Sequence, residues 1–317
     1  MNEPSSIDGV LVQWGDRLFY PGNRMVRSRT PNLRTPRRPQ SADAIRRRIE
    51  ATVRRVPQVM VKVTGGGRGI KAIAAHFRYI NKNGRLEIED ENGTRLQGRS
   101  AVHELAEDWR FGGSYIGDEG PRREAFNIML SMPRGTDAQI VLRAAREFAR
   151  EELAEHKYVM VLHEHQANPH VHISVRAESR QGRRLNPRKA DLHRWREVFA
   201  EKLRGWGIEA EATRQATRGA TRNHPDLWRV KAEADGRLLK PRNDHRRGAA
   251  VATSRAEARR AWQAIATALA QSGDAADRKL AASIDRFSRE MVQPGEREPT
   301  GRTHIEPSSP SVGGRTW

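Results

Sequence analysis

The sequence predicts an α+β fold in which a central antiparallel sheet is flanked by helices and followed by a helical C-terminal extension. Two observations favour this class. Strand-like and helix-like segments are mixed through residues 58–210, and at least two neighbouring pairs of strand-like segments are joined by short turns. Short turns connect antiparallel strands, whereas parallel neighbours need long crossovers, so a doubly wound parallel sheet is disfavoured.

The expected strands are short apolar or alternating runs that are bounded by turn residues. In chain order they are residues 58–63, 85–90, 94–98, 123–132 and the two halves of 157–178. Residues 91–93 read Glu-Asn-Gly, which is typical of a hairpin turn. The glycine-rich turn at residues 64–69 lacks the spacing of a nucleotide-phosphate loop, and a backbone nest for a DNA phosphate is the better interpretation.

The expected helices show apolar residues at helical spacing. Ile70, Ile73, Phe77 and Ile80 form one stripe, which predicts a helix from residue 70 to about 82. Thr136 and Asp137 are suitable caps for a helix that continues to residue 153. The other helices are expected at residues 41–56 with Ser41 as N-cap, at 100–110, and from Asn186 or Asp191 to about 206, with Trp195 and Phe199 in the core.

Changes in composition divide the chain into five expected parts. They are a basic and partly disordered N-terminal arm at 1–57, a folded core at 58–210, a basic linker at 211–252, a helical hairpin at 253–292 and a disordered tail at 293–317. Gly273 separates the two helices of the hairpin. Their apolar faces are expected to consist of Trp262, Ile265 and Leu269 in the first helix, and Leu280, Ile284, Phe287 and Met291 in the second.

The charge of the chain indicates a polyanionic partner. The 317 residues carry a net charge of +19 and a pI near 11.1, and such an excess repels itself in a compact chain. Nucleic acid is the first candidate. Cysteine is absent, which excludes disulfides and thiolate sites, so any metal must be held by His, Asp or Glu. There is no long apolar run and no secretory signal pattern, so we expect a cytoplasmic protein.

Four of the eleven histidines fall within ten residues, in the segment that predicts the last hairpin. Residues two apart in a strand share a face, so His163 and His165 point one way, and His170 and His172 do the same. A four-residue connection would set His165 opposite His170 and His163 opposite His172. Because neutral imidazole is the commonest metal ligand, this hairpin predicts a metal site.

Tyr79 is the candidate nucleophile. It lies well off the apolar stripe of its predicted helix, where its neighbours are Ala72, Ala75 and His76, and the two alanines leave room for a substrate backbone. An ordinary surface tyrosine is the competing interpretation, and Tyr115 in the glycine-flanked segment 111–117 is the next candidate. A phenol near a histidine-held cation suggests attack on a phosphodiester with a covalent phosphotyrosyl intermediate.

Three motifs resemble those of a known family. Residues 163–172, HEHQANPHVH, resemble the H-x-D-x-x-N-P-H-x-H motif of HUH endonucleases, and most closely that of conjugative relaxases of the P-type mobilisation, VirD-like class. Residues 78–84, RYINKNG, resemble the tyrosine motif of these relaxases, and residues 130–136, LSMPRGT, resemble their middle motif. All three occur in the family's order, over about residues 55–215. The resemblance therefore implies an HUH-type, palm-like sheet.

The resemblance also implies an activity. The chain would be a site- and strand-specific relaxase that nicks single-stranded origin-of-transfer DNA in conjugation or plasmid mobilisation, leaving a 5′-phosphotyrosine on Tyr79 and a free 3′-hydroxyl. His163, His170 and His172 would hold one divalent cation, with Mg or Mn expected and Zn, Ni or Co as alternatives. His165 stands where the family has Asp, so three alternatives stay open: His165 acts as the base, Glu164 does so after a local shift, or the site holds four nitrogens. Relaxosome proteins and a secretion coupling protein would be partners.

Further residues are expected to contact DNA. Ser131 of the middle motif would lie beside the nick, and the others are basic or polar residues near the motifs: His76, Arg78, Lys82, Arg134, Arg184, Asn186, Arg188 and Lys189. Three other classes of function stay open. One is a rolling-circle initiator or transposase with the same chemistry, although the tyrosine ahead of the histidines favours a relaxase. The second is a non-catalytic, basic single-stranded-DNA-binding protein, which would bind DNA without cutting it. The third is a metal phosphodiesterase that uses an activated water and would cut DNA without staying attached to it.

Overall fold

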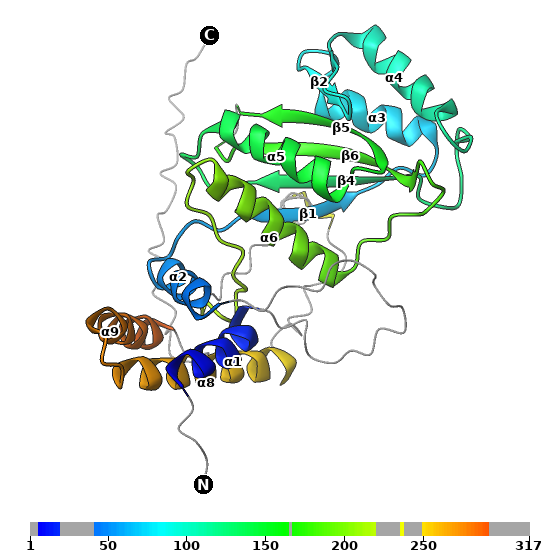
Figure 1. Ribbon diagram of the computed structural model, residues 1–317. Helices are drawn as coiled ribbons and strands as arrows, with labels where there is room; N and C mark the ends of the chain where they lie inside the picture. Colours follow the sequence, from blue (N-terminus) through cyan, green and yellow to red (C-terminus); the bar gives the residue numbers. More distant parts are fainter. Residues whose placement is uncertain (1–5, 20–40, 165–166, 220–234, 238–248, 292–317) are drawn as a thin grey trace, which may run out of the picture.

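The computed structural model describes residues 6–19, 41–164, 167–219, 235–237 and 249–291, and its centre is a six-stranded antiparallel sheet (Figure 1). The strands lie in the order β1-β4-β6-β5-β2-β3. Their bounds are β1 Met60–Gly65, β2 Ile88–Asp90, β3 Arg95–Leu96, β4 Ala125–Ser131, β5 His156–His163 and β6 His170–Ser179. The predicted α+β class is therefore confirmed.

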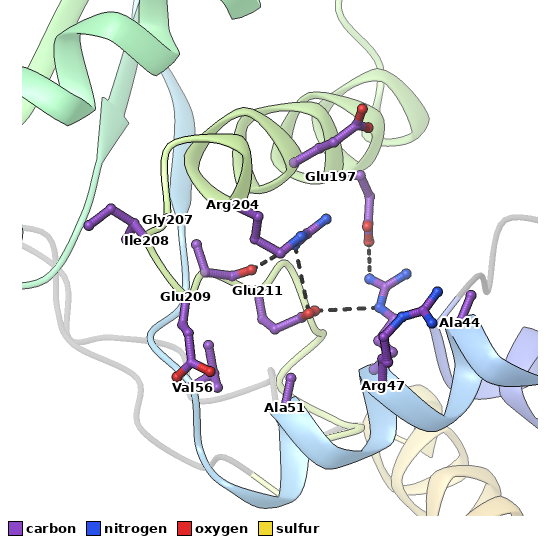
Figure 2. Close-up of a pocket in the computed structure, with 13 residues that line it drawn as sticks. Ala44, Arg47, Ala51, Val56, Glu197, Arg204, Gly207, Ile208, Glu209 and Glu211 are labelled. Atoms are coloured by element: carbon purple, nitrogen blue, oxygen red, sulfur yellow. Dashed lines mark hydrogen bonds and ion pairs between the residues drawn. The ribbon is translucent and has the colours of Figure 1, made fainter.

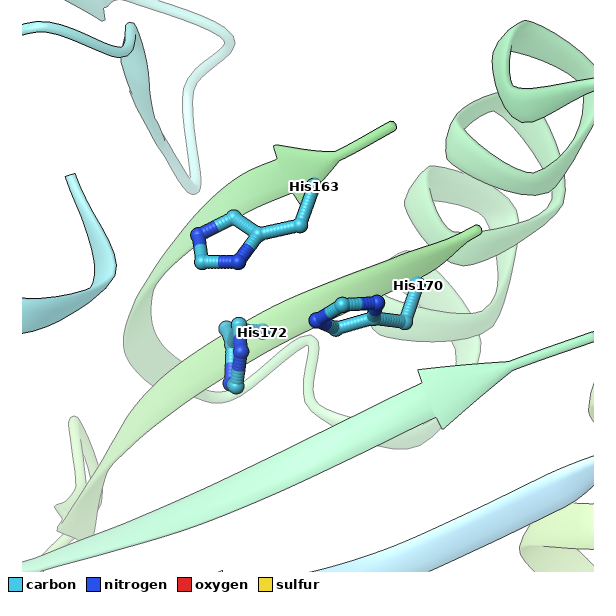
Figure 3. A group of neighbouring side chains, drawn as sticks. All are labelled: His163, His170 and His172. Atoms are coloured by element: carbon cyan, nitrogen blue, oxygen red, sulfur yellow. The ribbon is translucent and has the colours of Figure 1, made fainter. Parts of the chain in front are cut away.

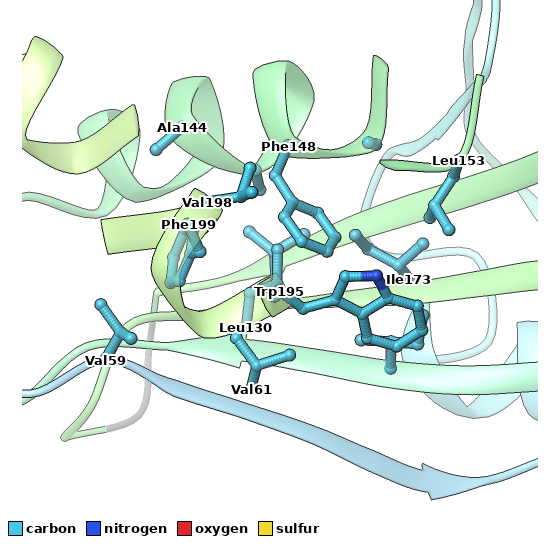
Figure 4. Close-up of a cluster of buried hydrophobic side chains, with 14 of the residues drawn as sticks. Val59, Val61, Leu130, Ala144, Phe148, Leu153, Ile173, Trp195, Val198 and Phe199 are labelled. Atoms are coloured by element: carbon cyan, nitrogen blue, oxygen red, sulfur yellow. The ribbon is translucent and has the colours of Figure 1, made fainter. Parts of the chain in front are cut away.

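One face of the sheet is covered by α5 (Ala138–Glu152) and α6 (Lys189–Gly205) (Figure 1). The core on this face consists of apolar side chains from β6 and β4 that meet rings of the two helices (Figure 4). Phe148 of α5 makes edge-to-face contacts with Trp195 and Phe199 of α6, at ring-centroid distances of 6.1 and 6.5 Å. The predicted core positions of Trp195 and Phe199 are thus confirmed.

The opposite face is covered in part by α3 (Ile70–Ile80) and α4 (Arg99–Phe111). The predicted apolar stripe of α3 is buried, and Phe77 contacts Trp109 of α4 with the ring centroids 4.9 Å apart. The helix ends at Ile80 rather than near residue 82, because Lys82 and Asn83 adopt φ angles of 53° and 57°. Tyr79 consequently lies in the last turn of α3.

A separate cluster contains helices from both ends of the described chain, packed against one another. It contains α1 (Ile7–Phe19), α2 (Ala42–Val53), α8 (Ala249–Ala270) and α9 (Ala275–Glu290), and its core includes Leu11, Leu18 and Trp262. The helical pair α8 and α9 was predicted. Helix α1 was not, because its apolar residues are matched by a surface on α8 more than 200 residues away in the sequence.

The described start of the expected linker packs against this cluster. The Thr217 hydroxyl donates to the Leu18 carbonyl, and the Trp262 indole donates to the Thr217 carbonyl. Most of the predicted arm between α1 and α2, most of the linker and the C-terminal tail lie outside the described residues. The division of the chain into five parts therefore stays a prediction.

A polar cavity of about 560 Å³ lies between α2, α6 and the segment 207–211 (Figure 2). Arg48 of α2 pairs with Glu197 of α6 and, at 3.5 Å, with Glu211, while Arg204 of α6 lies 3.7 Å from Glu211. Burial raises the pKa of the Glu211 carboxyl, and the two arginines oppose that rise. These ion pairs connect the helical cluster to α6, on the face of the sheet away from α3.

Replacing Asp137 by Ala is expected to lower the free energy of unfolding by about 1 kcal/mol, because its carboxylate caps α5. One carboxylate oxygen accepts from the backbone N–H of Gln139 at 2.7 Å and of Ile140 at 3.3 Å. Urea unfolding measures the change. Thr136→Ala is the matched control, since the Thr136 hydroxyl donates to the Pro133 carbonyl and caps no helical N–H. Equal losses in the two variants would contradict the assignment of Asp137 as the cap.

Candidate functional site

Three histidines at one end of the sheet form a compact cluster (Figure 3). His163 ends β5, and His170 and His172 begin β6, all on the face that carries α3. Their ring centroids are 4.6 to 5.0 Å apart, and one nitrogen from each lies within 4.8 Å of the other two. All three rings are buried, with exposed fractions of 4 to 9%. Each imidazole is thus positioned to share one ion.

The pairing of these histidines differs from the one expected. His163 lies opposite His170, and His172 lies opposite Val161, whereas the sequence suggested His163 opposite His172 and His165 opposite His170. The reason is that β5 ends at His163, so residues 164–169 form a six-residue connection rather than a four-residue one. His165 lies outside the described residues, and three imidazoles, rather than four, converge among those described.

Backbone carbonyls orient two of the rings. His163 Nε2 donates to the Ile80 carbonyl at 2.6 Å, and His170 Nδ1 donates to the Asn168 carbonyl at 2.9 Å. Each bond fixes the tautomer with its lone pair on the other ring nitrogen, as in histidines that bind metals. Nδ1 of His172 is buried and makes no hydrogen bond within the described part of the chain. The donor set therefore fits a divalent cation.

Burial favours the neutral form of His172 and of the neighbouring His76. Desolvation lowers the pKa of His172 to about 3, and the charges that His163, His170 and His76 would carry lower it as well. Desolvation alone lowers the pKa of His76 to about 4. Because neutral imidazole is the form that binds metals, the burial of these rings favours coordination at neutral pH.

The metal-free protein is expected to lose stability as the pH falls from about 6.5 toward 4. Unfolded histidine binds a proton near pH 6.5, whereas folded His76 and His172 stay neutral until a lower pH. The unfolded state therefore binds more protons in this window, and the free energy of unfolding decreases. Urea unfolding with chelator at several pH values measures this. His76→Gln should flatten the dependence, and an unchanged slope would contradict the explanation.

Tyr79 lies beside the cluster and faces solvent. Its side chain is 70% exposed, its ring stacks on His76 with centroids 6.0 Å apart, and its centroid lies 6.4 Å from that of His172. The bond from His163 to the carbonyl of Ile80, the residue after Tyr79, attaches the last turn of α3 to β5. The structure thus brings together the predicted nucleophile and the predicted metal ligands.

The other residues near the motifs that were predicted to contact DNA differ in their exposure to solvent. Arg78 and Arg134 are exposed, Lys82 is partly exposed, and His76 lies beside both Tyr79 and His172. Ser131 is 4% exposed, and its hydroxyl donates to the Pro169 carbonyl at 3.2 Å. Its observed contact is therefore with the β5–β6 connection, and the expected contact of Ser131 with DNA stays a prediction.

The four predicted contacts after β6 lie away from the triad. Arg184 pairs with Glu124 and Glu178, and it bridges to the end of β6 opposite to His170. A ten-residue strand spans roughly 30 Å, so residues that follow β6 in the sequence lie far from the histidines at its start. Asn186, Arg188 and Lys189 follow Arg184 into the start of α6, which packs on the other face of the sheet. They are not part of the site around the triad.

Two features of the site had no signal in the sequence. One is the Ile80 carbonyl, a backbone group whose role depends on how α3 meets β5. The other is the side of β1 that faces away from α5 and α6, where Met60 and Lys62 share rows with the triad. The alternation of side chains along β1 indicates which residues share a face, but it does not indicate which strand pairs with β1.

Comparison with known proteins shows what this chain is similar to. Residues 79–208 match the model of the relaxase family described as MobA/VirD2-like, nuclease domain. The chain is also similar to the T-DNA border endonuclease VirD2 of Rhizobium radiobacter, with 26% identity over an alignment that covers 51% of this chain and 43% of the relative. The chain thus spans less than half the length of that relative. The matched region begins at Tyr79 and contains the three histidines.

Proposed function

We propose that this chain, whose residues 79–208 match the MobA/VirD2-like relaxase family, nicks one strand of an origin of transfer through Tyr79 and stays covalently attached to the cut DNA. The single observation that carries the proposal is the 6.4 Å between the ring centroids of Tyr79 and His172. An exposed phenol beside three clustered imidazoles that fit a divalent cation is an arrangement suited to attack on a phosphodiester.

The proposed reaction is a transesterification. The phenolic oxygen of Tyr79 attacks phosphorus, a bond from phosphorus to that oxygen forms, and the bond from phosphorus to the 3′-oxygen of the preceding nucleotide breaks. The phenolic proton leaves the tyrosine, and a proton is taken up by the 3′-oxygen, so no other reactant is consumed. The products are a 5′-phosphotyrosyl bond and a free 3′-hydroxyl. Because the number of ester bonds is unchanged, the same site can rejoin the strand.

The residues around Tyr79 would lower the barrier by positioning. His163, His170 and His172 would hold a divalent cation, which would supply positive charge to stabilise the phosphodiester during attack. The bond from His163 to the Ile80 carbonyl keeps the tyrosine's helix turn next to those ligands. His76, whose Nε2 is buried and makes no hydrogen bond to the described residues, would orient the phenol through its stacked ring.

The substrate and partners follow from the family and belong to the proposal. Single-stranded origin-of-transfer DNA is the substrate, and accessory relaxosome proteins and a type IV secretion coupling protein are the partners, with the protein acting in the bacterial cytoplasm. Among the described helices, none is both long and apolar enough to cross a bilayer. The net charge of +19 supports a polyanionic substrate.

A denaturing gel tests the proposal. The protein is incubated with a library of fluorescent single-stranded oligonucleotides and a divalent metal, and DNA that stays attached after denaturation is sequenced while the modified peptide is mapped. We expect one preferred cut site and an adduct on Tyr79. Binding without scission under every divalent metal would instead support a non-catalytic DNA-binding protein, and scission without an adduct would indicate a water nucleophile.

A further inference from the structure

The outward side of β1 is exposed next to the candidate site. Along β1, Met60, Lys62 and Thr64 are exposed, while Val61 between them is 1% exposed and packs toward α5 and α6. The core that α3 and α4 form with the sheet contains residues of β2, β4 and β5 and, in the described part of the chain, none of β1. Met60 is 43% exposed, so its side chain is accessible to a ligand bound beside the site.

The register of the sheet makes this surface continuous with the histidine triad. Met60 lies opposite Ser131, Ser131 lies opposite His170, and His170 lies opposite His163. In the next row on the same face, Lys62 lies opposite Met129, which lies opposite His172. Neighbouring strands are about 4.8 Å apart, so Met60 is roughly 10 Å from His170 across the sheet. A nucleotide attached to a phosphate at the triad can span that distance.

Tyr79 approaches the triad from the other side. In the strand order, β6 with His170 and His172 lies between β5 on one side and β4 and β1 on the other. Helix α3 packs against Val159 and Val161 of β5, and its last turn is bound to His163 at the end of that strand. The tyrosine is therefore held on the β5 side. In-line displacement places the leaving oxygen opposite the attacking one, which here is the side of β4 and β1.

We propose that the outward face of β1 holds the upstream nucleotide, the one that carries the leaving 3′-oxygen, with Met60 against its base and Lys62 near a phosphate. This inference rests on the proposed function, and it adds that the DNA upstream of the nick contacts β1 of the sheet. The occupant is single-stranded DNA rather than a protein, because the surface is continuous with the triad and carries a lysine. A methionine suits an unpaired base, since its thioether is apolar and adapts to a flat ring.

The test couples one side chain to one base. Binding is measured with the cut-site oligonucleotide in a Tyr79→Phe background, which prevents cutting, using DNA that is intact or lacks one base. The missing base is either the upstream one or the downstream one, on the far side of the nick. With Met60 present, loss of the upstream base should weaken binding roughly fivefold, as expected for partial burial of one apolar side chain.

The variants separate this contact from general effects. Met60→Ala should weaken binding of intact DNA by a similar factor. In that variant, removing the upstream base should cause no further loss of affinity. The loss of affinity caused by removing the downstream base should be the same as with Met60 present. Met60→Leu should restore the coupling. Trp206→Ala is the matched control, because Trp206 is 42% exposed but follows α6, on the face away from the triad. Thermal unfolding checks that the variants are folded.

Two results would overturn the inference. If the missing upstream base weakens binding equally with Met60 present and in the Met60→Ala variant, Met60 does not contact that base. If Met60→Ala instead removes the loss of affinity caused by the missing downstream base, the DNA strand runs across the site in the opposite direction. Both leave the proposed function intact, since adduct formation by the protein with Tyr79 on the unmodified oligonucleotide is scored separately. Absence of any adduct would instead defeat the proposed function, and the inference with it.

Discussion

Replacing Tyr79 by Phe is expected to abolish the covalent DNA adduct and to lower the rate of cutting at least about a thousandfold. The change removes the one oxygen that would form the bond to phosphorus. It leaves the ring, its stacking on His76 and the histidine triad in place. Because Tyr79 is 70% exposed, its hydroxyl contributes little to folding. The rate is measured on denaturing gels with the cut-site oligonucleotide and divalent metal.

Binding and a second tyrosine provide the controls. The affinity of the Tyr79→Phe protein for uncut DNA should stay within about twofold of the wild type, since one neutral hydroxyl on an exposed ring contributes little net energy. Tyr115, the other exposed tyrosine considered as a nucleophile, is 62% exposed and follows α4. Tyr115→Phe should form the adduct at the normal rate. Normal cutting by Tyr79→Phe would refute the assignment of the nucleophile.

The sequence was informative where chemistry and local geometry coincide. The apolar stripe of α3 could be predicted because its residues are helical neighbours, and the exposure of Tyr79 followed from its position off that stripe. The histidine hairpin could be predicted because alternation along a strand gives the face of each side chain. These inferences depend on contacts within about ten residues, which sequence spacing controls.

The register of the hairpin could not be predicted in the same way. It depends on where β5 ends, and a two-residue difference in the connection changed which histidines are opposite each other without changing their face. This is why the triad formed although the expected pairing was wrong. A difference of one residue would have moved the imidazoles to the other face of the sheet.

Features that depend on long-range packing had no local signal. Helix α1 is stabilised by contacts with α8, and the ion pairs of Arg48 with Glu197 and Glu211 join segments about 150 residues apart. The basic residues after β6 were expected to contact DNA, and the length of β6 places Arg184 at the end of that strand away from the histidines. The order β1-β4-β6 is likewise what puts Met60 and Lys62 beside the histidines.

Removing the metal, or one of its ligands, is expected to lower the rate of adduct formation almost as strongly as removing the tyrosine hydroxyl. Chelation should lower adduct formation at least about a hundredfold, because the charge of the phosphodiester would then be left without its counter-ion. His172→Ala should weaken binding of Mn²⁺ by more than the roughly 10- to 100-fold that the loss of a ligand's outer partner costs. His172 is the clearest choice, since its buried Nδ1 has no hydrogen-bond partner among the described residues.

Thermal unfolding separates metal binding from activity. A metal that binds only the folded state raises its stability with concentration, so Mn²⁺ should raise the melting temperature of the wild type and have a much smaller effect on His172→Ala. Ser174→Ala is the matched control: Ser174 lies two residues along the same face of β6, is buried, and donates to the Asn127 side chain at 2.9 Å. That variant should keep the response to Mn²⁺. If wild type and His172→Ala respond alike, or if adduct formation survives chelation, the triad is not the metal site.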